Sequence, residues 1–149
     1  MMRLKLLQCG DFHLDAPFSS LSDMDGKPEQ RRHELRQALI RTVDLAEREK
    51  VDMLLICGDL YEHRYIRKST INFICEQFSR IPGIPVLIIP GNHDPAVPGS
   101  LYCYEKLPLN VHILAGSNCM YLDAASGASV RTFGTAEAVD RSRINIFMH

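Results

Sequence analysis

Three short apolar runs limit the folds that are open to this chain. They lie at residues 4–9, 53–57 and 86–89, and each one leads into glycine and polar residues. The second and third runs are almost uninterrupted, which is typical of strands that are covered on both faces of a parallel sheet. The runs therefore predict neighbouring parallel strands whose carboxyl ends carry polar side chains.

Two amphipathic segments separate these runs. Apolar side chains recur every three or four positions in residues 29–50 and again in residues 69–80, which predicts two helices. The elements alternate in the order strand, helix, strand, helix, strand. This order predicts right-handed βαβ units in a doubly wound α/β sheet with helices on both faces. Shorter elements are expected further along the chain, with a helix at 101–107 and strands at 111–114, 119–122, 130–133 and 144–149.

Size and charge exclude several classes of protein. The chain has 149 residues and a formal net charge of −1, so it can fold as one domain and cannot hold nucleic acid by bulk positive charge alone. Its five cysteines are odd in number and widely spaced, which favours a reducing, cytoplasmic compartment. No run approaches the ~20 apolar residues of a membrane helix, and we expect a soluble protein without a secretory signal.

Polar side chains gather where the predicted strands end. Asp11 and His13 follow the first strand, Asp59 follows the second, the segment 91–94 (Gly-Asn-His-Asp) follows the third, and His149 ends the last. In open α/β sheets, ligands bind outside the carboxyl ends of the strands. In an extended segment, residues two apart point the same way, so Asp11 and His13 can face one ion. Oxygen and imidazole donors without cysteine suit Mn²⁺, Fe²⁺ or Zn²⁺.

Each of these short motifs is weak alone, and a satisfied turn is the ordinary alternative for each of them. Their order along the chain is more specific. Asp11-Phe12-His13, Gly58-Asp59 and Gly91-Asn92-His93-Asp94 resemble the first three signature blocks of the calcineurin-like metallophosphoesterases. Within that superfamily, residues 13–17 and 58–61 resemble most the bacterial DNA-repair exonuclease branch, which is related to the nuclease subunit of the double-strand-break repair complex.

The resemblance implies a layered metallophosphoesterase-type α/β sheet and a dinuclear metal site, with Mn²⁺ the first choice and Fe or Zn as alternatives. It implies that Asp11 and His13 bind the first metal, that Asp59 bridges both, and that Asn92 and His149 bind the second. It also implies a catalytic His93, acting as a general acid or as a charge stabiliser. A carboxylate commonly orients such an imidazole, and Asp94 is the expected partner.

The sequence departs from this pattern at two places. Three residues after the bridging aspartate, where the repair nucleases carry His or Asp, stands Glu62, with His63 next; either could orient the catalytic imidazole, or neither. The later Gly-His-x-His block of the family is missing after His149. We therefore expect residues 1–149 to be the N-terminal part of the nuclease domain, a product of truncation or proteolysis, with weak or single-metal occupancy and little turnover.

A short basic segment follows the second strand. Arg64, Tyr65, Arg67 and Lys68 are candidates for binding a DNA backbone and stacking on a base, and a solvated basic turn is the alternative. Three functions stay open: a DNA exonuclease or endonuclease, a phosphoesterase acting on nucleotides or phosphoproteins, and a non-catalytic module that scaffolds an ATPase. The resemblance implies DNA as partner and makes a coiled-coil ATPase subunit and a homodimer further possible partners.

Overall fold

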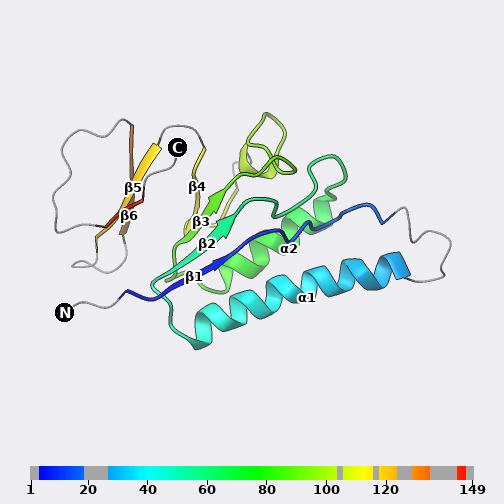
Figure 1. The fold of residues 1–149 in the computed structure, drawn as a ribbon, viewed down its shortest axis with the longest axis horizontal. Coiled ribbons are helices and arrows are strands. Elements are labelled where there is room, and N and C mark those ends of the chain that lie inside the picture. The colour runs from blue at the N-terminus through cyan, green and yellow to red at the C-terminus, as the bar shows by residue number, and fades with distance from the viewer. Residues whose placement is uncertain are drawn as a thin grey trace.

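Four parallel strands form the main sheet of the computed structural model, in the order β1-β2-β3-β4 (Figure 1). The structure describes residues 4–18, 27–103 and 106–115, together with the backbone of residues 118–123, 129–134 and 144–146. The strands are β1 (Leu6–Cys9), β2 (Met53–Cys57), β3 (Val86–Ile89) and β4 (Val111–Ile113). The predicted bounds of the second and third strands are confirmed at both ends.

The two central strands are buried because both of their faces carry apolar side chains. Leu54 and Ile56 of β2 face one side and are fully buried, and Met53 faces the other with 1% of its surface exposed. In β3, Leu87 lies on the Met53 side and is fully buried as well. This two-sided burial is the reason why the runs show no polar alternation.

Two helices follow the first two strands. They are α1 (Lys27–Arg48) and α2 (Lys68–Ser79), close to the predicted positions. The fully buried side chains of Leu39, Val43 and Ala46 form the inner stripe of α1, and that stripe packs into the same core cluster as Ile74 of α2.

The α/β class is therefore confirmed, but the two described helices do not divide between the two faces as expected. Both described helices contribute to the cluster that contains Leu54 and Ile56. Since each strand is added on the same side of the previous one, right-handed crossovers place successive helices on one face. The opposite face has a smaller apolar cluster around Met53, Leu87 and Leu114, to which no described helix contributes.

Beyond β3 the elements are short. A 3-10 turn spans Leu101–Cys103, and a separate antiparallel sheet has the order β6-β5-β7. Its strands are β5 (Asn118–Asp123), β6 (Ser129–Gly134) and β7 (Ile144–Ile146). Each predicted strand in this region has a counterpart, while His149 lies outside the described residues. No helix in the described part of the chain is long and apolar enough to cross a membrane.

Glycines allow the loops after the strands to approach each other closely. A Cβ atom at Gly10 would lie 2.7 Å from the carbonyl oxygen of Cys57. A Cβ atom at Gly91 would lie 2.2 Å from Oδ1 of Asp59 and 2.7 Å from its backbone nitrogen. Only glycine permits these separations, so the polar residues after β1, β2 and β3 are brought to one place by backbone contact.

Substituting Gly91 tests whether this close approach matters. Gly91→Ala is expected to lower the free energy of unfolding by about 2 kcal/mol, because the added methyl group collides with Asp59 and the two loops must separate. Urea denaturation followed by circular dichroism measures the change. The matched control is Gly83→Ala, where a Cβ meets no described atom within 4 Å and stability should stay the same or rise by about 0.4–1 kcal/mol. Equal effects of the two substitutions would contradict the explanation.

Candidate metal centre

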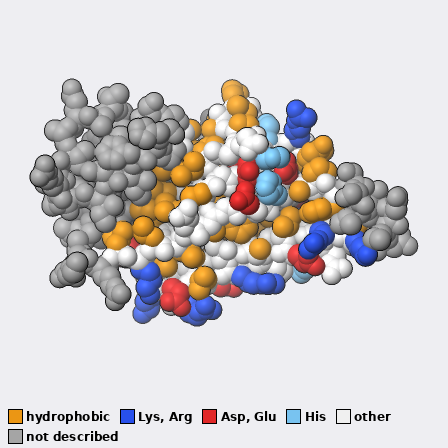
Figure 2. Space-filling model, viewed as in Figure 1, with side chains coloured by type: hydrophobic (Ala, Val, Ile, Leu, Met, Phe, Trp, Pro, Cys, Tyr) orange, Lys and Arg blue, Asp and Glu red, His pale blue; other side chains and the backbone are white. Residues whose placement is uncertain are grey.

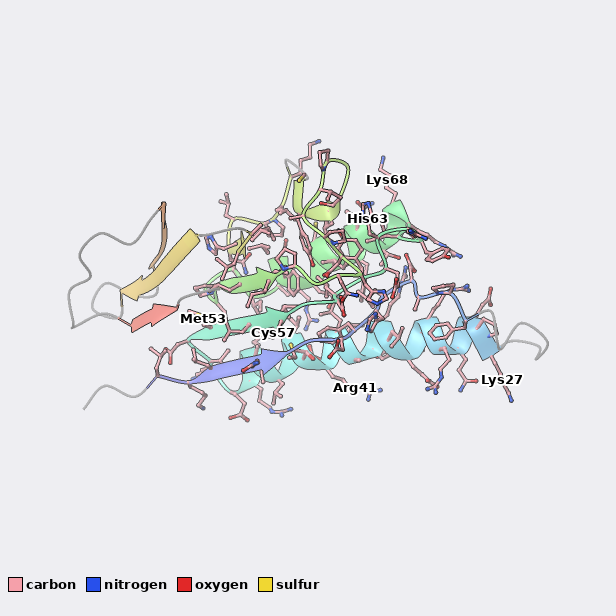
Figure 3. The ribbon with its side chains drawn as sticks, turned by 45° about the horizontal axis from the view of Figure 1, so that its top comes forward. Lys27, Arg41, Met53, Cys57, His63 and Lys68 are labelled. Carbon is pink, nitrogen blue, oxygen red and sulfur yellow. The ribbon has the colours of Figure 1, made fainter. Side chains whose placement is uncertain are left out.

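The loop after β1 runs beside the loop after β2, and this pairing sets the geometry of the site. The backbone N–H of Asp11 donates to the carbonyl of Gly58 at 3.1 Å, and the N–H of His13 donates to the carbonyl of Asp59 at 2.9 Å. An isolated parallel bridge between Leu14 and Tyr61 continues the pairing. Figure 2 shows acidic and histidine side chains gathered on one part of the surface, and Figure 3 shows that the labelled His63 lies beyond the end of β2 that carries Cys57.

Three side chains form a group suited to a metal ion. Nε2 of His13 lies 3.8 Å from Oδ1 of Asp11 and 3.9 Å from Oδ2 of Asp59. One ligand atom from each residue falls within 4.8 Å of the other two. Two carboxylate oxygens and one imidazole nitrogen at this spacing fit a divalent cation of the harder type, so the residues present fit the metal expected from the sequence.

The backbone reaches this arrangement by an unexpected route. The sequence predicted an extended segment here, and that prediction is wrong. Asp11 and His13 have φ angles of 55° and 48°, so both residues lie in the left-handed region. Phe12 between them is nevertheless buried, with 6% exposed, as expected. Asp59 also has a positive φ, of 54°. Left-handed residues other than glycine cost of order 1–3 kcal/mol each and concentrate at functional sites.

Asp59 uses its two oxygens differently. Oδ2 faces His13, while Oδ1 accepts a hydrogen bond of 3.0 Å from the backbone N–H of His93. The carboxylate is therefore fixed by the loop that follows β3 and has one oxygen directed to the metal group. Its side chain is 15% exposed, against 80% for Asp11.

Glu62 lies between the two histidines of the site. Its carboxylate is 2.9 Å from Nδ1 of His13 and 3.0 Å from Nδ1 of His93, and the two imidazole rings meet edge to face with centroids 5.0 Å apart. Of the two orienting residues left open by the sequence, Glu62 makes the contact. His63 does not: its Nδ1 is buried and has no hydrogen-bond partner among the described residues.

The hydrogen bond to Glu62 also affects the charge of His93. It is the largest cause of a pKa raised above the ordinary value for histidine, with the nearby charges of Glu62, Asp59 and Asp94 acting in the same direction. A raised pKa means that the imidazole keeps its proton to higher pH than a free histidine does.

Asp94 does not orient His93, which corrects the role expected for it. It is fully buried, and its carboxylate accepts hydrogen bonds from the backbone N–H groups of Asp59 at 2.9 Å, Leu60 at 2.8 Å and Gly91 at 2.6 Å. The hydroxyl of Tyr102 is a further donor. A buried carboxylate needs such donors, and here they come from the loops after β2 and β3. Among the hydrogen bonds of the described residues, none joins Asp94 to the His93 ring.

Tyr102 is a residue of the site that the sequence did not single out. Its pKa is raised far above the ordinary value, first by burial and then by the charge of Asp94, so it stays a hydroxyl donor. In the sequence, Tyr102 is only an aromatic residue with a hydroxyl group in a short predicted helix. That pattern does not indicate which carboxylate the hydroxyl contacts.

The basic segment divides between two places. Arg64 and Tyr65 are exposed and line a cleft of about 460 Å³ together with Glu62, His63, Asn92 and His93. Arg67 and Lys68 are not among the residues that line it. They stand at the beginning of α2, where the backbone N–H of Arg67 donates to Oδ2 of Asp15 at 2.8 Å. The structure thus brings Asn92 and part of the basic segment beside His93, while His149 lies outside the described residues.

Comparison with known proteins now gives the class of this protein. Residues 4–142 match the family model described as calcineurin-like phosphoesterase. The match covers well over half of the chain and includes the parallel sheet and the metal-ligand group, so the chain belongs to the calcineurin-like phosphoesterase family. This is a family of metal-dependent phosphoester hydrolases.

A curated relative supports the assignment. The chain is 34% identical over 117 residues to the uncharacterized metallophosphoesterase YhaO of Bacillus subtilis (strain 168). The aligned part is 76% of this chain and 28% of the relative, so the chain spans somewhat more than a quarter of that protein's length.

Glu62→Gln tests the array of one carboxylate and two imidazoles. The neutral amide removes the charge that holds the proton on His93, so the pKa of His93 in the metal-free protein should fall toward or below the usual histidine value. Histidine NMR titration measures it directly. Glu76→Gln, an exchange of the same type at an exposed position of α2, is the control and should leave the His93 titration unchanged. An unaltered His93 pKa in Glu62→Gln would show that the contact is absent in solution.

Proposed function

We propose that this chain carries part of the active site of a cytoplasmic DNA-repair exonuclease or endonuclease that hydrolyses phosphodiester bonds with two divalent ions, Mn²⁺ being the first choice. The observation that carries the proposal is the position of the Asp11–His13–Asp59 group beside a cleft lined by His93, Arg64 and Tyr65. A metal-ligand group next to an imidazole, a guanidinium and an exposed aromatic ring suits a phosphodiester that also has bases to stack.

Different residues have different roles in the proposed hydrolysis. Asp11, His13 and Asp59 would hold the first ion, and Asn92 and His149 would complete the second site. When bound, such ions lower the pKa of water and neutralise charge on phosphoryl oxygens. Asp59 is held by the His93 backbone, so its ligand oxygen keeps its position as substrate enters.

His93 would meet the phosphate or the leaving oxygen. Nδ1 of His93 contacts the carboxylate of Glu62. Nε2 is therefore the ring nitrogen that can donate a proton or stabilise negative charge. The raised pKa favours the protonated ring that either role requires. The sequence offered Asp94, Glu62 and His63 as residues that could orient the His93 ring. In this proposal Glu62 has that role.

Cysteine chemistry and the resemblance support the proposed compartment and partners. The four cysteines in the described residues, Cys9, Cys57, Cys75 and Cys103, are unpaired, which supports a reducing compartment. Burial raises the pKa of the Cys9 thiol to about 12, which fits a core residue rather than a nucleophile. DNA is the proposed substrate and partner. A coiled-coil ATPase subunit and a second copy of the chain remain proposals that rest on the resemblance alone.

Hydrolysis assays with Mn²⁺ test the proposed function. The full-length protein should degrade end-labelled DNA and a bis-aryl phosphate, and it should be much slower on a mono-aryl phosphate. Asp59→Asn in that protein should lose activity by about 100-fold or more, since a charged metal ligand is removed. Asp44→Asn, a surface carboxylate of α1, is the control. Preference for the mono-aryl phosphate would favour a phosphomonoesterase instead, and no Asp59-dependent turnover would favour a scaffold.

Charge reversal tests the DNA-binding surface separately from the chemistry. Arg64→Glu should weaken DNA binding and reduce the salt dependence of log K by roughly 0.7–0.9 for each phosphate that is no longer neutralised, because fewer counterions are released. Fluorescence anisotropy at several salt concentrations measures both effects. Bis-aryl phosphate hydrolysis should change less than DNA binding, because the proposed role of Arg64 is contact with the DNA backbone.

Arg41→Glu is the matched control for this experiment, since Arg41 is exposed on α1 and does not line the cleft (Figure 3). Arg67→Glu makes a further comparison, because Arg67 stands outside the cleft at the start of α2. Identical salt slopes for the Arg64 and Arg41 variants would show that the segment is only a solvated turn.

A further inference from the structure

A second cleft opens beside the metal-ligand group, and the proposed chemistry does not use it. Its volume is about 430 Å³, within the range of about 300–1,000 Å³ of small-molecule sites. Its walls come from the loop after β1 and from the first turns of α1: Asp11, Phe12, His13, Phe18, Arg31 and Leu35. Two of these residues, Asp11 and His13, also belong to the metal group.

The inner walls of this cleft are apolar. Phe12 is buried, and Phe18 and Leu35 are half-buried, so their remaining surface faces the space between the loop and the helix. Ala16 adds a small apolar side chain to the lining. Aromatic walls of this kind favour a flat, unsaturated ligand, because base-like rings stack on phenyl rings regardless of sequence.

The cleft carries charge of both signs: Arg31 contributes a guanidinium and Asp11 a carboxylate. Arg31 precedes Leu35 by four positions on α1, so the two side chains lie on the same side of the helix. The guanidinium pairs with Glu34 at 2.8 Å, yet the Arg31 side chain is 61% exposed and can also meet an anion in solvent. The cleft therefore combines apolar walls, an exposed guanidinium and two of the proposed metal ligands.

We propose that this cleft binds the nucleobase of the nucleotide adjoining the phosphate that is cleaved. The proposal deepens the nuclease function and rests on it. A phosphate near Asp11 and His13 would have its attached nucleoside within reach of this cleft, because those two residues line both sites. The base would lie against Phe18, and Arg31 would face the anionic backbone. Stacking without hydrogen-bond readout gives binding that tolerates any base.

The decisive experiment measures base binding without metal and without turnover. In saturation-transfer NMR on the metal-free protein, the adenine protons of adenosine should receive saturation from the protein. Phe18→Ala should abolish most of that signal, because the stacking surface is gone. Phe73→Ala is the matched control: Phe73 is also half-buried, but it lies on α2 against the guanidinium of Arg36 and does not line the cleft. It should leave the signal unchanged.

Two further measurements make the outcome unambiguous. Phe18→Leu keeps an apolar side chain without a ring, so a folded Phe18→Leu protein with a weakened signal supports stacking even if the alanine variant unfolds. In calorimetry with Mn²⁺, AMP should bind about tenfold or more tightly than ribose 5-phosphate, and Phe18→Ala should remove the difference.

An adenosine signal that is equal in wild type, Phe18→Leu and Phe18→Ala overturns the proposal. So does equal affinity for AMP and ribose 5-phosphate. Either result leaves the nuclease proposal intact, whereas failure to hydrolyse DNA would leave the adenosine signal in place. The two proposals can therefore fail separately.

Discussion

The buried carboxylate of Asp94 is the interaction on which the site depends. A charged group with no exposed surface is stable only if donors replace the water it has lost, and here the donors are three backbone N–H groups and the hydroxyl of Tyr102. Two of the backbone donors belong to the loop after β2 and one to the loop after β3. Satisfying one charge therefore locks these loops together and fixes Asp59 between them.

The parts of the fold that follow from local pattern could be predicted from the sequence. The strands at 53–57 and 86–89 and the stripe of α1 were predictable because burial of apolar side chains decides them residue by residue. The grouping of Asp11, His13 and Asp59 followed from a general rule about the ends of parallel strands. The backbone conformation did not follow, since left-handed residues at Asp11 and His13 are imposed by pairing with the loop after β2.

The sequence did not decide which carboxylate contacts the His93 ring. Asp94 is adjacent to His93, and this proximity along the chain suggested that it would orient the imidazole. The chain instead turns Asp94 inward, and Glu62 reaches His93 from 31 positions away. The side of the sheet on which the helices lie also depends on strand order, which the apolar pattern does not specify. The cleft at Phe18 arises only when α1 comes beside the loop after β1.

In the proposed function, the array around Glu62 would link metal binding to proton transfer. A histidine that binds a metal through Nε2 must be neutral and carry its proton on Nδ1, which is the atom that His13 presents to Glu62. His93 presents Nδ1 to the same carboxylate but needs a second proton on Nε2 to act as an acid, and its raised pKa favours that state. One carboxylate thus contacts Nδ1 of both rings, whose centroids lie 5.0 Å apart. In the proposed reaction, the ring facing Asp11 and Asp59 would bind a cation, and the ring lining the cleft would donate a proton.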